Sequence, residues 1–281
     1  MALLLLPSFV FLAIFTVYPI LRTIGLSFFQ QDMASSISEF VGLGNFLGLW
    51  HDALFWKVVV NTFYFVMGIV PISLALAIIM AMMANRVFRG NRAVQAVFFY
   101  PVVLPLVAVA NIWLYLYSPN GLFSAVLAFF RIFNVNPLAD TSTVIPALIV
   151  MLIWKDASFY MIFYLAAFKN LPEDVYEAAA LDGAHGWRLF WRITFPLLMP
   201  TTVFCVVMAT ADSFHLIDHL IIMTQGGPNN ASNTLLYYTY QNSFQFLDPG
   251  KASALTAVLL VILLIIFGVQ FLGLDRKITY A

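Results

Sequence analysis

The sequence predicts an all-α, polytopic membrane protein with six transmembrane helices in one domain, residues 1–281. Two observations support this prediction. Hydrophobic residues make up 63% of the chain and charged residues only 9%, whereas a soluble domain carries about 25% charged residues to cover its surface. Six stretches are also apolar over the length of about 20 residues that a helix needs to cross a bilayer.

The six predicted spans alternate with connections that are richer in polar and turn-forming residues. They are expected at Leu3–Phe28, Trp56–Asn85, Ala93–Tyr117, Val144–Phe168, Pro200–Thr224 and Ala252–Gly273. The first stretch has neither the basic region nor the cleavage site of a signal peptide, so we interpret it as a retained helix. Pro101 and Pro105 are expected to kink the third span, as part of a moving element or as static packing.

Arginine and lysine residues predict the orientation, because they are enriched in cytoplasmic connections. The second and fourth connections and the C-terminal tail hold most of them, at Arg86, Arg89, Arg92, Lys169, Arg188, Arg192, Arg276 and Lys277. The other connections hold few. Both termini and the charged loop 169–196 are therefore expected on the cytoplasmic side, where this loop is the largest feature.

Several classes of function find no support in the residues. The formal net charge is zero, so no basic field attracts nucleic acid. The single cysteine, Cys205, excludes an internal disulfide and a cysteine metal site, and the four histidines form no known zinc motif. Phosphate-loop, GxSxG and HExxH motifs are missing from the sequence. We therefore expect a chain in membrane lipid that is not an enzyme and binds no metal or cofactor itself.

The charged loop predicts a short helix with a small-residue surface. Pro172 suits a first helical position, and Glu173 and Asp174 place negative charge at the positive helix end. Three alanines follow, and Gly183 is a plausible stop. A helix of this kind suits docking in a partner's groove, although a surface helix that only links two spans explains the pattern equally well.

The spacing in this loop resembles a known motif. Glu177-Ala178-Ala179, followed by Gly183, Ile193 and Pro196, is similar to the EAA loop of ABC importer permeases, with Phe195 in place of the usual Leu. The resemblance implies a type I ABC importer permease fold and a coupling helix seated in a cleft of an ATPase subunit. The residues that carry over are Glu177, Ala178, Ala179, Asp182, Gly183 and Ala184.

Three further segments, Phe40–Phe46, Tyr117–Leu122 and Met223–Pro228, resemble carbohydrate-uptake permeases of the maltose and glycerol-3-phosphate type. The resemblance implies import of a sugar or sugar derivative in a bacterial or archaeal cytoplasmic membrane. It also implies three kinds of partner: a second homologous permease, two ATPase subunits that hold ATP and Mg, and a periplasmic or lipid-anchored solute-binding protein. Glycerol-3-phosphate is the alternative solute. Its phosphate would favour a basic pathway residue, for which Lys155 and Arg22 are the nearest candidates.

Polar residues within the spans are candidates for the solute pathway, because charge inside a membrane is costly and often functional. Asp212, His215 and His219 have the spacing of one helix face, and Asp218 lies beside them. Hydrogen bonds to neighbouring helices, or a proton relay in a secondary transporter, would use the same residues. Further candidates are Trp154, Asn61 and Asn111, for which an interfacial belt or helix–helix contacts are alternative roles.

The fifth connection, Gln225–Gly250, is expected to face the periplasm. Gly226, Gly227 and Pro228 predict a tight turn, and Asn229 follows it. These four residues are candidates for contact with a solute-binding protein, and a solvated loop without a partner is the alternative.

Overall fold

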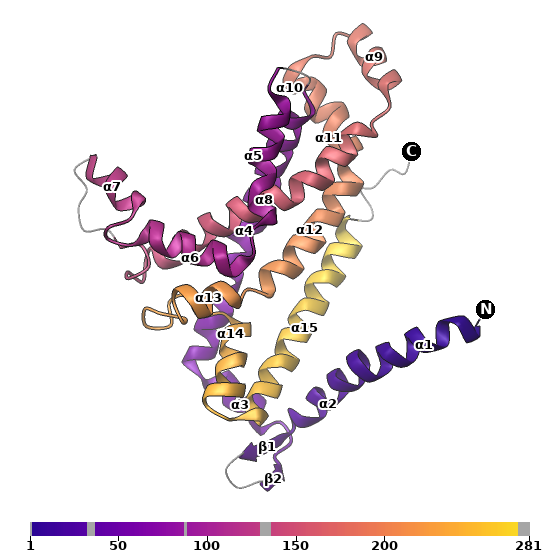
Figure 1. Cartoon of the computed structure of the whole chain (residues 1–281). Coiled ribbons are helices and arrows are strands. Elements are labelled where there is room, and N and C mark those ends of the chain that lie inside the picture. The colour runs from indigo at the N-terminus through magenta and orange to yellow at the C-terminus, as the bar shows by residue number, and fades with distance from the viewer. Residues whose placement is uncertain (1, 33–36, 87–88, 130–135, 275–281) are drawn as a thin grey trace.

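The computed structural model describes residues 2–32, 37–86, 89–129 and 136–274, and these are almost entirely helical (Figure 1). The elements in chain order are α1 (Ala2–Leu12), a π-helical turn η1 (Ala13–Val17), α2 (Tyr18–Leu26), β1 (Phe29–Asp32), β2 (Ile37–Phe40), α3 (Gly44–His51), α4 (Ala53–Asn85), α5 (Asn91–Val103), α6 (Leu106–Tyr117), α7 (Leu122–Phe129), α8 (Val144–Lys169), α9 (Glu173–Leu181), α10 (Gly186–Leu189), a π-helical turn η2 (Phe190–Thr194), α11 (Phe195–Leu197), α12 (Met199–Phe214), α13 (Asp218–Met223), α14 (Leu235–Tyr240), a π-helical turn η3 (Gln241–Gln245) and α15 (Pro249–Leu274).

The predicted spans are confirmed as apolar helical segments. Five helical segments of the described chain are long and apolar enough to cross a membrane, and the bent pair α5–α6 makes a sixth. Their bounds agree closely with the sequence prediction for α4 and α8, whose apolar runs end at polar turns. The orientation of the termini stays a prediction.

The third span is bent much more sharply than a simple kink. Helix α5 and the helical segment that begins with α6 meet at 101°. Leu104 is extended, with φ −75° and ψ 129°, because the following Pro105 disfavours a helical conformation there. The prediction of a proline kink is therefore confirmed, and the bend lays α6 against α13.

The fifth span is broken, and the expected continuous polar face is wrong. Helix α12 ends at Phe214 and α13 begins at Asp218. The side chain of Leu216, within the break, is buried in the core, and the Leu216 carbonyl accepts a 3.4 Å hydrogen bond from the Thr234 hydroxyl. These contacts come from distant parts of the chain, so a helical spacing rule did not anticipate them.

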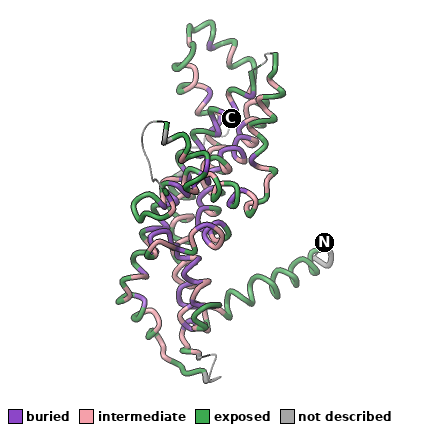
Figure 2. The backbone as a smooth tube through the Cα atoms, turned by 60° about the vertical axis from the view of Figure 1, so that its left-hand side comes forward, coloured by how far each residue is buried: buried purple, intermediate pink, exposed green. Residues whose placement is uncertain are grey.

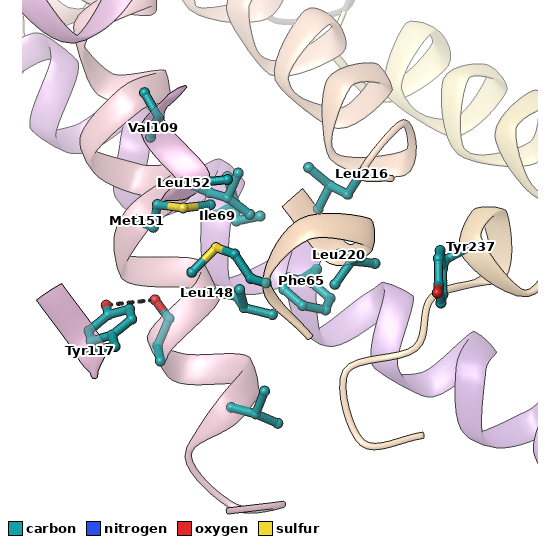
Figure 3. Packing of buried hydrophobic residues seen from close by; sticks show 14 of the residues in the cluster. Phe65, Ile69, Val109, Tyr117, Leu148, Met151, Leu152, Leu216, Leu220 and Tyr237 are labelled. Carbon is teal, nitrogen blue, oxygen red and sulfur yellow. Dashed lines mark hydrogen bonds between the residues drawn. The ribbon is translucent and has the colours of Figure 1, made fainter. Parts of the chain in front are cut away.

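Helices α4 and α8 pack against each other at the centre of the molecule and contribute 15 and 10 buried residues; buried residues are purple in Figure 2. Phe65 and Ile69 of α4 meet Leu148, Met151 and Leu152 of α8 in one apolar cluster. In Figure 3 the same cluster extends to Leu216 and Leu220 beside the broken fifth span, and the Tyr117 hydroxyl donates a 2.9 Å hydrogen bond to the Ala147 carbonyl. The core therefore includes both discontinuous spans.

Two features at the N-terminal end depart from the rest. The first connection contains a two-stranded antiparallel hairpin, β1–β2, which the all-α prediction missed. Asn45 supports it by donating to the carbonyls of Ser27 and Phe29. The first span, residues 5–26, has no buried residues and projects from the remaining helices (Figures 1 and 2).

Candidate coupling and pathway sites

Helix α9 presents the small-residue surface that the charged loop predicts. It stands at one extreme of the molecule, beyond the ends of the spans (Figure 1). Ala179 is buried, whereas Glu177, Ala178, Asp182 and Gly183 are exposed. The exposed part is available to a partner, and the alanine side chain allows close approach.

The end of α9 explains why glycine occupies position 183. Gly183 has φ +71°, a left-handed conformation that side chains disfavour. Its N–H donates to the Ala180 carbonyl, and the N–H of Ala184 donates to the Ala179 carbonyl at 2.9 Å. This paired arrangement is a Schellman motif, which satisfies the last carbonyls of a helix. The predicted helix stop at Gly183 is therefore confirmed, while the coupling role of these residues stays a prediction.

One hydrogen bond links α9 to the start of the fifth span. The Tyr176 hydroxyl donates to the Thr194 hydroxyl at 3.1 Å. Thr194 lies in η2, directly before the helical segment that leads into α12. The Tyr176 side chain thereby joins α9 to the segment that leads into the fifth span. Tyr176 is not recognisable from the sequence, because a tyrosine in a loop helix has no distinctive spacing.

The candidate pathway residues of the fifth span fall into different environments. Asp212 is exposed, and its carboxylate accepts a 2.7 Å hydrogen bond from the buried Tyr160 of α8. His215 is exposed and its Nδ1 lies 2.8 Å from the Ala211 carbonyl of its own helix. Asp218 is also exposed. The side chains of Asp212, His215 and Asp218 are therefore accessible at the surface of the isolated subunit.

His219 does not share that accessibility. Its side chain has 0% relative exposure, and neither ring nitrogen has a hydrogen-bond partner among the described residues. A buried imidazole without partners is unusual, since buried polar groups are normally hydrogen-bonded. In this conformation His219 therefore does not line an open path together with Asp212.

Trp154 and Asn111 make local contacts. The Trp154 ring lies edge to face with Trp113 of α6, with ring centroids 5.9 Å apart, and thus joins α8 to α6. Asn111 is exposed and donates to the Val107 carbonyl of its own helix at 2.8 Å. Neither contact requires a solute, and both support the structural alternatives that the sequence left open.

Lys155 has a well-defined role at the bend of the third span. Its ammonium group donates to the carbonyls of Leu104 at 2.8 Å and Pro101 at 3.3 Å. The bend interrupts the helical hydrogen bonds there, and backbone groups inside a membrane need substitute partners. A side chain of the fourth span therefore supplies the donors that the third span lacks.

Asn61 holds the fifth connection against α4. Its side-chain amide is buried and donates to the carbonyls of Asn233 at 2.9 Å and Asn230 at 3.2 Å. One turn earlier, Lys57 donates to the Asn229 carbonyl at 2.6 Å. The polar residue predicted as a pathway candidate is thus a support for the loop.

The four predicted contact residues of this loop differ in exposure. Asn229 is exposed, and Gly227 and Pro228 are partly exposed. Gly226 is buried with φ +80°, and a Cβ there would lie 3.0 Å from the Tyr237 ring. Gly226 therefore cannot contact a partner directly in this conformation. It packs against the Tyr237 ring, where there is no room for a larger residue.

An ion pair joins the N-terminal end of α4 to the last helix. Asp52 caps α4 by accepting from the Leu54 N–H at 2.9 Å, and it also accepts from Lys251 at 3.0 Å and the Tyr238 hydroxyl at 2.8 Å. Burial raises the pKa of Asp52, but the hydrogen bonds from Lys251, Tyr238 and Leu54 outweigh it, and the pKa is lowered. The carboxylate thus connects α4, α14 and α15.

Together, the apolar helical spans define the class of polytopic, all-α membrane proteins. The chain belongs to the family described as binding-protein-dependent transport system inner membrane component, whose sequence pattern matches residues 73–279. It is therefore a transport subunit of the inner membrane.

Known relatives and structures agree with this assignment. The sn-glycerol-3-phosphate transport system permease protein UgpA of Yersinia enterocolitica is 31% identical over 99% of this chain and 95% of that protein. UgpA of Agrobacterium fabrum has the same identity and coverage. A chain of the crystal structure of a bacterial alginate ABC transporter, in complex with an alginate pentasaccharide-bound periplasmic protein, matches with a TM-score of 0.86, 25% identity and coverage of 100% and 95% of the two chains. These similarities confirm the type I ABC importer permease fold.

Proposed function

We propose that this chain forms half of the membrane pathway of an ATP-driven importer for a sugar or sugar derivative. A separate ATPase pair, which holds ATP and Mg, docks at α9, and a solute-binding protein delivers the solute from the opposite side. ATP binding closes the ATPase pair and moves α9. The spans then open outward, and hydrolysis returns them to the inward-facing state.

The observation that supports this proposal most strongly is the exposed and tethered α9. Its alanine surface lies beyond the spans, and Tyr176 connects it to Thr194 at the entry to the fifth span. A surface helix that only links two spans would need neither a small-residue face nor a hydrogen bond of this kind. A helix that transmits movement benefits from both.

The exposed first span supports the presence of a second permease. Residues 5–26 are predominantly apolar and none is buried by this chain. Lipid can cover such a helix, but a helix that leaves its own bundle is also free to pack on a homologous subunit. A second subunit would complete the pathway around the exposed Asp212, His215 and Asp218.

A sugar is favoured over a phosphate as the solute, although the relatives act on both kinds. The relatives named for sn-glycerol-3-phosphate transport are 31% identical, and the alginate transporter chain is 25% identical with a TM-score of 0.86. A phosphate needs a positive partner. Of the two basic candidates, Lys155 uses its ammonium group on two backbone carbonyls, and Arg22 is exposed on the first span. Ligand identification on the cognate binding protein separates the two solutes, because glycerol-3-phosphate binding there would overturn the sugar.

Substitution of Ala178 tests the coupling proposal. In Ala178→Trp the large ring covers the alanine surface, so the ATPase subunits should no longer co-purify and ATP-driven uptake into proteoliposomes should be lost. Ala139→Trp is the matched control, because Ala139 is exposed and lies in the connection before α8, far along the chain from α9. ATP-driven uptake that persists in Ala178→Trp at the level of the control would contradict docking at α9. Uptake that a protonophore abolishes without any need for ATP would instead support a proton-coupled transporter.

A further inference from the structure

An apolar groove lies between α4 and the segment that links α9 to the fifth span. Its volume is about 860 Å³, within the range of roughly 300–1,000 Å³ that is typical of sites for small ligands. Along α4 its wall consists of residues three and four apart, including Leu74, Ile78 and Met82. The opposite wall is aromatic, with Phe190 and Trp191.

The groove ends at a positive charge. Arg86, directly after the last residue of α4, lines the apolar groove and also an adjoining polar cavity of about 470 Å³. Lys169 and Glu173 line that polar cavity as well, so the three charged side chains carry a net positive charge. An apolar chamber that continues into a basic one matches a molecule with an apolar tail and an anionic head.

Two tryptophans lie at the groove where a membrane surface is expected. Trp187 is 75% exposed and Trp191 is 47% exposed, and their rings are in edge-to-face contact, with centroids 5.5 Å apart. Exposed indoles are enriched at the level of lipid headgroups. Their position beside Arg86 therefore places the junction of the two cavities at a membrane interface.

A sugar is a poor match for this groove. Apart from the Tyr164 and Thr202 hydroxyls, the side chains on its apolar part offer few hydrogen-bond partners for a hydroxyl-rich solute. Basic pockets between membrane helices on the cytoplasmic side suit anionic lipid headgroups. The groove is thus distinct from a pathway for a polar solute.

We propose that this groove binds an anionic phospholipid of the cytoplasmic leaflet, with its acyl chains between α4 and η2 and its phosphate at Arg86. The choice of leaflet depends on the proposed function, which places α9 on the cytoplasmic side. A lipid here contacts Phe190 of η2, the same segment that holds Thr194 and thus the tether to α9. The bound lipid therefore supports η2, to which α9 is hydrogen-bonded.

Native mass spectrometry of the assembled transporter tests this site with phosphatidylglycerol and phosphatidylcholine of identical acyl chains. The wild type should retain phosphatidylglycerol preferentially. Arg86→Gln should reduce that preference roughly fivefold, the effect of removing one basic residue near an anionic surface. Arg92→Gln is the matched control, because Arg92 is exposed and lines a different cavity, and it should retain the wild-type preference.

A second variant tests the apolar part. Ile79 lines the groove and is 53% exposed, so Ile79→Trp should fill the space and reduce retention of both lipids while the complex stays assembled. Equal retention of the two lipids by the wild type, or unchanged retention in Ile79→Trp, would overturn the proposal. Cross-linking of Ile79→Cys to a second permease chain would also overturn it, since the groove would then be an interface between subunits. These outcomes are independent of ATP-driven uptake in the Ala178→Trp test.

Discussion

Lys155 illustrates how a charged residue within a span is used for structure. Its ammonium group reaches the two carbonyls at the bend of the third span, 51 and 54 residues earlier in the chain. A charge in a membrane is by default a functional candidate, and glycerol-3-phosphate would have favoured such a residue. The observed contacts explain its presence without a solute.

Lys155→Met should destabilise the subunit, because it leaves the carbonyls of Leu104 and Pro101 without their donor. An unsatisfied buried polar group costs about 1–3 kcal/mol. Thermal unfolding of the purified complex should therefore show a lower Tm for this variant. Lys155→Arg keeps donors at the bend and should retain most of the stability. A Tm for Lys155→Met equal to that of the wild type would show that the bend does not depend on this contact.

His219, a predicted pathway residue, is buried without a hydrogen-bond partner among the described residues, whereas Lys155 has two. The expected face of Asp212, His215 and His219 required an unbroken helix, but the helix ends at Phe214. After the break His219 turns into the interior, with no hydrogen-bond partner among the described residues. Spacing along a helix thus identified residues of unusual polarity but not their surroundings.

At the scale of elements, the fifth connection is held by α4 rather than by its own turn alone. The Asn61 amide donates to two loop carbonyls, and the Thr62 hydroxyl accepts from the Leu235 N–H at 2.9 Å. The loop that is proposed to meet a binding protein is therefore positioned by the second span. Its buried Gly226 permits this close packing.

Asn61→Leu should loosen this loop, because the carbonyls of Asn230 and Asn233 lose their donor while the side-chain volume is nearly kept. Hydrogen exchange measured by mass spectrometry should increase in residues 225–234. Asn111→Leu provides the control, since the Asn111 amide bonds only within its own helix in the described contacts. Equal exchange in the loop of both variants and the wild type would argue against this support.

The Asp52 cluster makes the junction of α4, α14 and α15 sensitive to acid. The lowered pKa of Asp52 means that its ionised form stabilises the folded state. This contribution is present above the unfolded pKa of about 3.9 and is lost as the pH falls through the lower folded value. In Asp52→Asn the Tm should be below that of the wild type at pH 7, and the difference should diminish toward pH 3. A constant difference over that range would contradict the assignment.

At the scale of the whole molecule, this chain leaves one span and several charged side chains uncovered. Its core lies around α4 and α8, whereas the first span and the polar residues before the break in the fifth span remain uncovered. This distribution is expected of one half of a two-subunit pathway. In the lipid proposal, a phospholipid rather than a protein covers the apolar groove between α4 and η2.

A cysteine at Ile14 tests the proposed second permease. Ile14 is 53% exposed in the first span, and the native Cys205 is buried. A membrane-permeable bifunctional thiol reagent should therefore cross-link Ile14→Cys to a cysteine-bearing partner permease when the two are co-expressed. Val150→Cys, which is 52% exposed on α8, controls for random collision. Equal cross-linking at both positions would indicate that lipid alone covers the first span.

The sequence by itself determined the features that depend on neighbouring residues. The length of the apolar runs placed the spans, and the alanines with Gly183 placed α9 and its end, because span length and helix capping are local properties. The spacing around Glu177 led to the same family as the full comparison. Pro105 likewise indicated the site of the bend in the third span.

Only the tertiary structure decided what the polar residues within the spans contact. The partners of Lys155 and Asn61 lie at least 51 residues away, and Lys251, which pairs with Asp52, lies 199 residues away, so no local pattern reveals them. The break at His215–Ile217 likewise follows from the burial of Leu216 and its bond with Thr234. Helix periodicity describes an isolated helix, whereas in a membrane the donors and acceptors freed at a bend or break are satisfied by whichever distant element packs beside them.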